Sequence, residues 1–471
     1  MDVSDFELSF SDKNITPWGG MSLMKRMLDR MGFDSALKDF GLPTPASNRG
    51  YSPAQLISQL MIGIWCGANR YEHTEITRMD DVLRRIFGFT RMAGHRAISR
   101  FFCKFDQSLS QKVFDNFFTW FFKSININYV TLDLDSTVIT RYGNKQEGAT
   151  KGYNPNKKGR ASHHPLMAFV ADTEMVANFW LRPGSTHSAN NVSGFLDNTL
   201  ERLGKINCSL IRADSGFASN DFFVKLEKQN LNYIIALPMM QTLQRQLASQ
   251  TGWWPLDSIE GQREGKFGEN SGKGIELCCF QWQANSWSKP RRVIAVRQNI
   301  KVREEIQKRA LGKQLSFFAE DDAQFGKYRY GAMVTDLTLS ALEIWRLYRG
   351  RANCENRIKE LKYDFGADSF NQKNFFATEA TLSTAMMAFN FMSLFRKTLI
   401  KGTTNQTLKT LRYKLFAIPG YVTNSGRRQT LNLALALKRR EWVNGLWERS
   451  SSFTNPVLYS SIFEPSRERV L

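Results

Sequence analysis

Four polar residues in the segment YRGRANCENRIKELK, residues 348–362, have the types and spacing of a site that handles phosphate. Tyr348, Arg351, Glu355 and Lys362 follow the pattern Tyr-x2-Arg-x3-Glu-x6-Lys. At about 100° per residue, these offsets predict that all four side chains lie within roughly a 60° wedge of one helix face. A carboxylate held among a guanidinium, an ammonium and a phenol can bind a cation or meet a phosphate. The alternative is an ordinary surface helix, because an exposed Arg351–Glu355 pair contributes only about 0.3–0.5 kcal/mol.

Two aspartates stand at the ends of segments with strand character. Asp135 closes the apolar part of YVTLDLDSTVIT, and Asp214 ends SLIRAD before a Ser-Gly turn. Asp133 is an alternative to Asp135, since residues two apart on a strand point to the same face. A single strand-end aspartate is more often a cap or a turn former. Two of them with a later carboxylate on a helix indicate a shared site.

Carboxylates that are brought together repel one another, and a divalent cation removes that repulsion. Mg²⁺ suits such an oxygen site because it uses few carboxylates, several waters and phosphate oxygens. Two such ions can activate a water or a 3′-hydroxyl and stabilise the leaving oxygen of a phosphodiester. We expect Mg²⁺ here, with Mn²⁺ as a substitute.

The elements that must position these residues change in character along the chain. Residues 1–128 carry apolar residues at three- and four-residue steps and predict a helical N-terminal domain. Its basic residues Arg96, Arg100 and Lys104 could lie along DNA or be solvated. From residue 129 to 240, segments rich in β-branched residues alternate with segments of helical pattern, which predicts an α/β layer with a mixed sheet.

The remaining segments complete the predicted organisation. Residues 241–335 contain short β-like pieces and several tryptophans, and predict a β-rich insertion. Residues 336–400 return to helices and carry Glu355. The C-terminal region 401–471 has a basic excess, and we expect it to contact DNA, to mediate dimerisation or to be a solvated surface.

The composition indicates a polyanionic partner, since the formal net charge is +20. The glycine-rich loop 141–160 has six basic residues and one acidic residue. We expect its Lys157, Lys158 and Arg160 to follow a phosphate backbone without reading the sequence. No apolar run is long enough to predict a membrane span, and the N-terminus lacks signal-peptide character. Six scattered cysteines without CxxC spacing argue against a zinc site and for a reducing cytoplasm.

Taken together, these motifs resemble a known family of enzymes. The order strand-Asp, strand-Asp, insertion, helix-Glu, with the Tyr-Arg-Glu-Lys signature, is similar to the insertion-sequence transposases that carry a DDE triad. It is most similar to the group named for insertion sequence four. The segments LDLDSTV, GYNPNKKGRASHHP and RADSGF resemble the branch named for insertion sequence thirteen-eighty.

The resemblance implies an RNase H-like catalytic core interrupted by the β-rich insertion. It implies that Asp135, Asp214 and Glu355 bind the metals and that Tyr348, Arg351 and Lys362 contact DNA phosphates. Double-stranded DNA, as terminal inverted repeats and as target, is the implied partner, with a homodimer on paired ends. The implied reaction is nicking at the element ends followed by strand transfer, and the implied location is the bacterial cytoplasm, at the nucleoid.

Three questions stay open at this stage. Relatives stack a flipped base on an aromatic residue, and Trp253, Trp254 and Trp282 are the candidates, although a core tryptophan is the simpler interpretation. His163, His164 and His187 are expected to pack or to contact phosphate. A catalytically inactive DNA-binding protein of the same fold and a stand-alone nuclease are the alternatives to a transposase.

Overall fold

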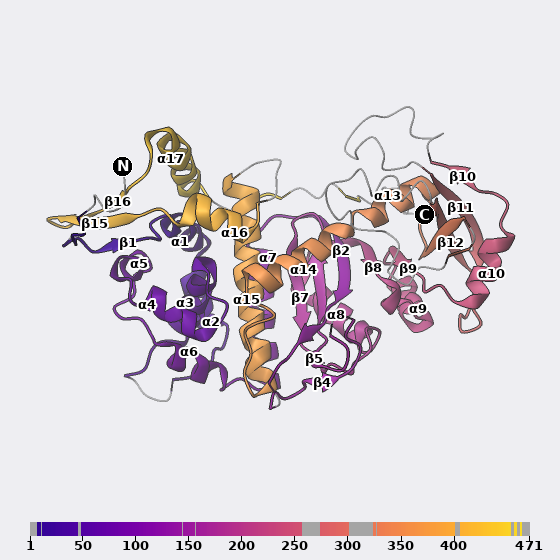
Figure 1. Cartoon of the computed structure of the whole chain (residues 1–471), viewed down its shortest axis with the longest axis horizontal. Helices are drawn as coiled ribbons and strands as arrows, with labels where there is room; N and C mark the ends of the chain where they lie inside the picture. The colour runs from indigo at the N-terminus through magenta and orange to yellow at the C-terminus, as the bar shows by residue number, and fades with distance from the viewer. Residues whose placement is uncertain are drawn as a thin grey trace. The chain divides into compact units, whose positions relative to one another are not determined.

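The chain forms two compact units in the computed structural model (Figure 1). One unit combines Met1–Asn126, Tyr142–Gly148 and Lys359–Leu458, and the other combines Ile127–Arg141, Ala149–Ile358 and Tyr459–Leu471. We call them the helical unit and the sheet unit. The structure describes residues 7–10, 12–45, 49–143, 145–155, 157–256, 274–300, 324–325, 327–400, 406–453, 456–458 and 462–463.

The sheet unit is organised around a large mixed sheet. The strands lie in the order β10-β11-β12-β14-β9-β8-β2-β6-β7, with β13 paired to β14. β2 (Tyr129–Ser136), β8 (Asn207–Ala213) and β9 (Tyr233–Ala236) are mutually parallel, and β6 (Leu166–Val170) runs antiparallel to β2. β2 is buried along nearly its whole length, as expected of a parallel strand that is covered on both faces.

The strands of the expected insertion extend this same sheet. β14 (Tyr328–Thr335) pairs antiparallel with β9, so that β10 to β14 continue the sheet beyond the parallel strands. The other strands of the unit are β3 Ile139–Thr140, β4 Thr150–Lys151, β5 Ala161–His163, β7 Met175–Trp180, β10 Trp254–Pro255, β11 Ile275–Trp282, β12 Arg291–Asn299 and β13 Gln324–Phe325.

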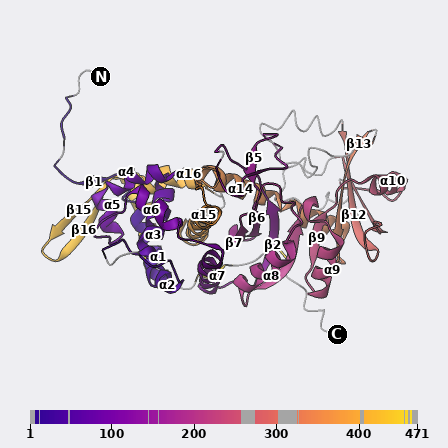
Figure 2. The same cartoon turned by 90° about the horizontal axis from the view of Figure 1, so that it is seen from below.

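Helices cover both faces of the sheet (Figure 2). α8 (Val192–Leu203) packs on β7, where Asn178 donates to Phe195 O, Asn198 Oδ1 and Thr199 Oγ1. α13 (Ala341–Arg349) packs on β11 and β12 through an apolar cluster that includes Ile344 and Trp345. The other helices among the described residues of this unit are η3 Ser215–Phe217, α9 Asn220–Lys228, α10 Gln241–Ser249 and the part of α14 (Ala352–Asp364) up to Ile358.

The helical unit surrounds one long apolar helix. α15 (Phe375–Phe395) is buried along nearly all of its length and packs against α3 (Pro53–Cys66) and α7 (Gln107–Lys123). The other elements are β1 Ile15–Thr16, α1 Met21–Met31, α2 Phe33–Asp39, η2 Tyr71–His73, α4 Thr74–Arg78, α5 Asp81–Ile86, α6 His95–Phe102, η4 Arg396–Ile400, α16 Leu408–Leu411, η5 Arg412–Phe416, β15 Gly420–Ser425, β16 Arg428–Leu433 and α17 Leu437–Ser451.

The prediction of one continuous helix through residues 348–362 was wrong. α13 ends at Arg349 and α14 begins at Ala352. Tyr348 therefore lies on one helix, while Glu355 and Lys362 lie on the next, and the expected common wedge does not form. The amide of Arg351 donates to Tyr348 O at 2.9 Å, which is a tighter turn than an α-helix makes.

Among the described residues, no helix has the length and apolar character that crossing a membrane requires.

One half-buried carboxylate links the early and late parts of the sheet unit. Glu227 on α9 accepts hydrogen bonds from Tyr233 Oη (3.0 Å) and from Arg291 Nε (2.7 Å) on β12, and pairs with Lys289. Burial by itself raises the pKa of Glu227, but the bonds from Arg291 and Lys289 outweigh it, so its pKa lies below the ordinary value.

This arrangement predicts an acid-sensitive contribution to stability. Because the folded pKa is lowered, the stabilisation by Glu227 is complete above the unfolded pKa of about 4.3 and is lost as the pH falls through the folded pKa. We expect Glu227→Gln to have a lower free energy of unfolding than the wild type at pH 7 in urea unfolding, and this difference to become smaller towards pH 3. Glu201→Gln, at an exposed position, is the control. A difference in free energy of unfolding that does not depend on pH would contradict the role of the ion pair.

Candidate active site

The two aspartates lie side by side at one edge of the sheet. β2 and β8 are adjacent parallel strands in which Leu134 pairs with Ala213. Asp135 is the next residue on β2, and Asp214 immediately follows β8. Each is fixed by a backbone amide, since Asp135 Oδ1 accepts from Ser136 N at 2.8 Å and Asp214 Oδ1 accepts from Gly216 N at 2.9 Å.

The junction between α13 and α14 is bound to the same strand ends. Tyr348 Oη donates to Ala213 O at 3.2 Å, and Arg351 Nη2 donates to Leu134 O at 3.1 Å. Further along α14, Arg357 pairs with Glu174 at 3.1 Å in the turn between β6 and β7. Glu355 lies between these two arginine anchors, so the position of its part of the helix is determined from both sides.

The charges in this group are strongly coupled. Arg351 Nη2 lies 3.0 Å from Asp135 Oδ2, and both side chains are about nine-tenths buried. Burial raises the pKa of Asp135 to about 6; Arg351 opposes this rise, and the charges of Asp214 and Glu355 add to it. Burial lowers the pKa of Arg351, but the charge of Asp135 outweighs it and raises that pKa above its ordinary value. The charges of Asp214 and Glu355 therefore both reach Asp135.

The donor set fits Mg²⁺ in its chemistry, because all three groups offer the carboxylate oxygens that this ion prefers. In the part of the chain that the structure describes, no three His, Cys, Asp or Glu side chains are close enough together to hold one ion directly. Mg²⁺ binds through one or two carboxylates plus waters and phosphate oxygens, so the arrangement is compatible with binding without such a cage.

Asp133 has a different partner from Asp135. Its two oxygens accept from Arg212 Nε at 2.6 Å and Nη2 at 2.8 Å, and both side chains are almost completely buried. Both carboxylate oxygens of Asp133 are thus engaged by one guanidinium. Asp135 instead lies at the strand end, within range of Asp214 and Glu355.

A loop that sequence reasoning did not identify borders the aspartates. Ser188 Oγ lies 2.8 Å from Ser136 Oγ, directly beside Asp135. Arg182 holds this loop, because its guanidinium donates to the carbonyls of His187 (3.1 Å), Ser188 (3.4 Å) and Asn190 (2.9 Å). The only signal in the sequence was Arg182 before the pair Pro183-Gly184, and an arginine before a turn has many ordinary explanations.

The histidines are part of the same surroundings. His164 Nδ1 lies 2.8 Å from Thr186 O, and burial lowers the pKa of His164. A carbonyl only accepts, so Nδ1 carries the proton in the neutral ring. His163 Nδ1 accepts from Arg141 Nε at 3.0 Å and is buried, while His187 Nδ1 accepts from Ala189 N at 3.2 Å.

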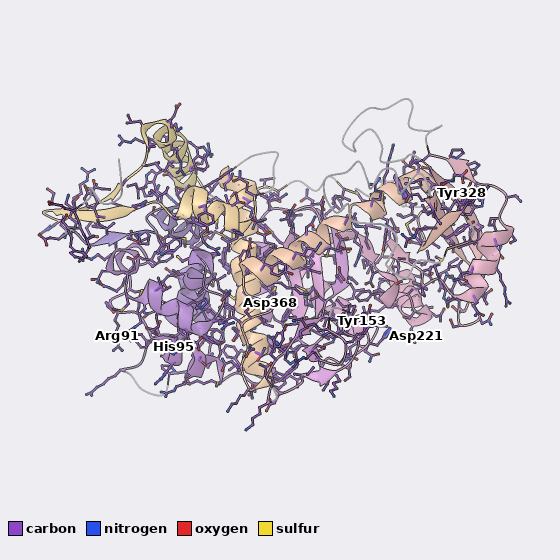
Figure 3. The ribbon with its side chains drawn as sticks, in the orientation of Figure 1. Arg91, His95, Tyr153, Asp221, Tyr328 and Asp368 are labelled. Carbon is purple, nitrogen blue, oxygen red and sulfur yellow. The ribbon has the colours of Figure 1, made fainter. Side chains whose placement is uncertain are left out.

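The basic loop is exposed and connected to this border. Lys157, Lys158 and Arg160 are exposed, and Tyr153 of the same loop is labelled in Figure 3. The small sheet β3-β5-β4 carries the loop. A Cβ on Gly152 would lie 2.0 Å from Gly184 O, so only glycine permits the loop to approach the segment that contains Ser188.

The remaining predicted residues are Lys362 and three tryptophans. Lys362 is half-buried in the last turn of α14, in the part of the chain that belongs to the helical unit. Trp282 is buried against Trp287 with ring centroids 5.0 Å apart, whereas Trp254 on the edge strand β10 is 52% exposed. Trp253 is partly exposed, and Arg297 lies over its ring at 4.4 Å.

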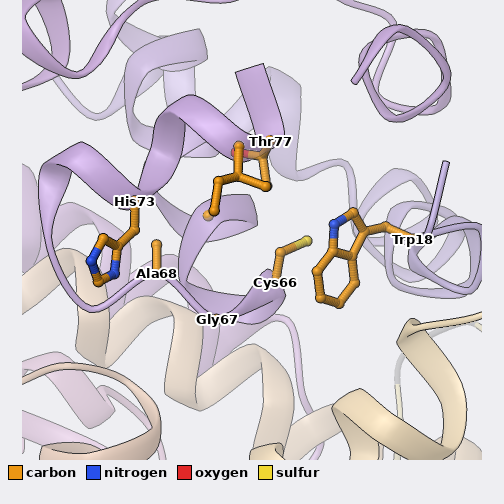
Figure 4. A pocket seen from close by; sticks show the side chains of 8 residues that line it. Trp18, Cys66, Gly67, Ala68, His73 and Thr77 are labelled. Atoms are coloured by element: carbon orange, nitrogen blue, oxygen red, sulfur yellow. The ribbon is translucent and has the colours of Figure 1, made fainter. Parts of the chain in front are cut away.

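A pocket of about 210 Å³ lies in the helical unit (Figure 4). Its lining is largely small or apolar and includes no carboxylate; it consists of Trp18, Gly63, Cys66, Gly67, Ala68, His73, Ile76 and Thr77. This pocket therefore offers no chemistry for phosphodiesters.

Comparison with known proteins identifies the family of the chain. No curated protein sequence matches the chain. A solved structure, described as the piggyBac transposase synaptic complex with hairpin DNA, is similar at 12% identity and a TM-score of 0.42, covering 86% of this chain and 82% of that chain. A similarity of this size carries no argument about function. The family described as Transposase DDE domain group 1 matches residues 2–451, nearly the whole sequence, and the chain therefore belongs to this transposase family.

Proposed function

We propose that the protein is the transposase of an insertion sequence, which hydrolyses phosphodiesters at the element ends and then joins those ends to target DNA, by a cut-and-paste route. One observation carries the proposal. In a member of the DDE transposase family, Asp135 and Asp214 end adjacent parallel strands, and the charge of Glu355 reaches Asp135 from α14.

Asp135, Asp214 and Glu355 would hold Mg²⁺, or Mn²⁺ in its place. A divalent metal bound there would offer activation of an attacking oxygen and charge stabilisation of the leaving oxygen. The chain itself orients Asp135 through Ser136 N and Asp214 through Gly216 N. Arg351 compensates the charge of Asp135, which limits the cost of bringing acidic groups together in a buried place.

Tyr348, Arg351 and Lys362 are assigned to the phosphates near the cleaved bond. Tyr348 and Arg351 bind backbone carbonyls at the strand ends, and Arg351 also binds Asp135. A phosphate at this edge would therefore replace existing partners of these side chains. Lys362 would contribute charge from the far end of α14.

The assignment of the fold follows from the same proposal. We regard the catalytic core as RNase H-like, which is supported by a mixed sheet β7-β6-β2-β8-β9 whose extension by β10–β14 precedes the Glu355 helix. The proposed segments are 1–128 for DNA binding, 129–240 and 336–400 for the core, 241–335 for the insertion and 401–471 for DNA contact or dimerisation.

The tip of one hairpin suits duplex DNA as the partner. The tip of the β15–β16 hairpin, residues 423–430, is exposed throughout and contains Arg427 and Arg428 but no acidic or apolar side chain. A two-stranded ribbon of this kind fits the major groove.

We further propose that a homodimer acts on paired terminal repeats at the bacterial nucleoid and that the element belongs to the insertion sequence thirteen-eighty branch.

We expect Glu355→Gln to abolish cleavage while DNA binding survives, because the amide keeps the shape of the side chain but loses the charge that a metal site needs. The rate should fall by about 10³-fold or more. The measurement is single-turnover nicking of labelled duplex DNA that carries the terminal repeats flanking the gene, with and without Mg²⁺.

Glu201→Gln, on the exposed surface of α8, controls for the charge change. Metal-dependent nicks that persist with Glu355→Gln would remove Glu355 from the mechanism. Tight binding by the wild type without nicks in Mg²⁺ or Mn²⁺ would favour an inactive DNA-binding protein. Nicks without joined products would favour a stand-alone nuclease.

We expect Lys157→Ala/Lys158→Ala to weaken DNA binding equally on all sequences. Loss of two phosphate contacts reduces the slope of log K against log salt by about 2. Filter binding from 50 to 300 mM salt measures this slope. Lys205→Ala/Lys228→Ala removes the same charge from exposed positions elsewhere in the sheet unit, and equal slope changes in the two variants would mean that only net charge matters.

A further inference from the structure

The carbonyl of Leu347 has an unusual partner at the break between α13 and α14. In an uninterrupted α-helix, the amide of Arg351 would donate to this carbonyl, four residues earlier. That amide instead donates to Tyr348 O at 2.9 Å. Leu347 O accepts from Nη1 of Arg212, on β8. A strand side chain therefore takes the position of a helix hydrogen-bond donor.

Arg212 is rigidly held where it does this. It pairs with Asp133 directly across the parallel β2–β8 register, through Nε at 2.6 Å and Nη2 at 2.8 Å. Its side chain is completely buried. Two nitrogens of the guanidinium bind Asp133. Because the guanidinium is planar and rigid, the third nitrogen then points at Leu347 O.

Gly350 leaves room for this contact. A Cβ at Gly350 would lie 2.8 Å from Arg212 Nη1. The backbone of Gly350, at φ −56° and ψ −20°, is ordinary right-handed helix that any residue adopts. Glycine is therefore required here by the guanidinium and not by the backbone conformation.

We propose that Arg212, oriented by Asp133, is a positioning residue that keeps the helix broken at Gly350 and so places Arg351 and Glu355 over the ends of β2 and β8. The inference rests on the proposed function for its catalytic consequence. Tyr348 is bound to β8 through Ala213 O, and Arg351 is bound to β2 through Leu134 O. Closing the helix would move at least one of them from its strand. Asp133 then serves the structure of the site and leaves metal binding to Asp135.

Gly350→Ala tests the proposal without changing any charge. The added methyl group displaces the guanidinium from Leu347 O, and we expect the single-turnover cleavage rate at saturating DNA to fall at least tenfold. The DNA concentration for half-maximal rate should change much less than the rate, because the exposed basic loop with Lys157 and Lys158 and the β15–β16 hairpin, which are proposed to bind duplex DNA, lie outside the break. Gly194→Ala is the matched control, since the nearest atom to its Cβ is 3.8 Å away. Rates are normalised to the folded, active fraction.

Arg212→Lys is the second variant. An ammonium keeps the charge opposite Asp133 but cannot make the bidentate pair and the third bond together. We expect a similar loss of rate. We also expect the double variant Arg212→Lys/Gly350→Ala to lose little more rate than either single variant, because both changes remove the same contact, from Arg212 to Leu347 O. Additive losses, or wild-type rates in both single variants, would overturn the proposal.

Hydrogen exchange of peptides covering residues 345–358 measures the break independently of cleavage. We expect the exchange of these amides to change in Gly350→Ala and Arg212→Lys but not in Gly194→Ala. Unchanged exchange in both variants would refute the positioning role. A wild-type protein that never cleaves DNA would refute the proposed function, and the exchange result would still decide whether Arg212 maintains the break.

Discussion

The parallel pairing of β2 with β8 is the constraint on which the candidate site depends. It brings the ends of two strands that are distant in sequence to one edge of the sheet, and with them Asp135 and Asp214. It also sets Asp133 directly opposite Arg212. The α13–α14 junction binds to the carbonyls of these same strands, so the placement of the third carboxylate follows from the pairing of the first two strands.

Burying acidic groups together is costly, and the surroundings show how the cost is limited. Asp135 and Asp133 are each matched by an arginine, Arg351 and Arg212, with little exposed surface. These two pairs lie on successive inward positions of one strand. Burial, with the charges of Asp214 and Glu355, still raises the pKa of Asp135 to about 6, so the compensation by Arg351 is incomplete.

The outline of the fold could be predicted from local patterns. The strands around Asp135 and Asp214 form where β-branched and apolar residues alternate, and the apolar stretch after residue 374 forms the long buried α15. The prediction of a single helix through 348–362 was wrong because the residue pattern has helical periodicity on both sides of Gly350. Nothing local distinguishes Arg212 as the donor that takes Leu347 O, since that contact spans 135 residues.

The sequence by itself determined which residues are the candidates for the chemistry, because the two aspartates, the glutamate and the basic loop are local motifs. It also determined that the aspartates end strands, through patterns of a few residues. Only the tertiary structure decided that Asp133 pairs with Arg212, that Arg182 holds the loop beside Asp135, and that the helix breaks before Glu355. The Asp133–Arg212 pair and the contact that accompanies the helix break span 79 and 135 residues. The loop contact depends on which carbonyls the backbone turns towards Arg182. Spacing along the chain encodes none of these.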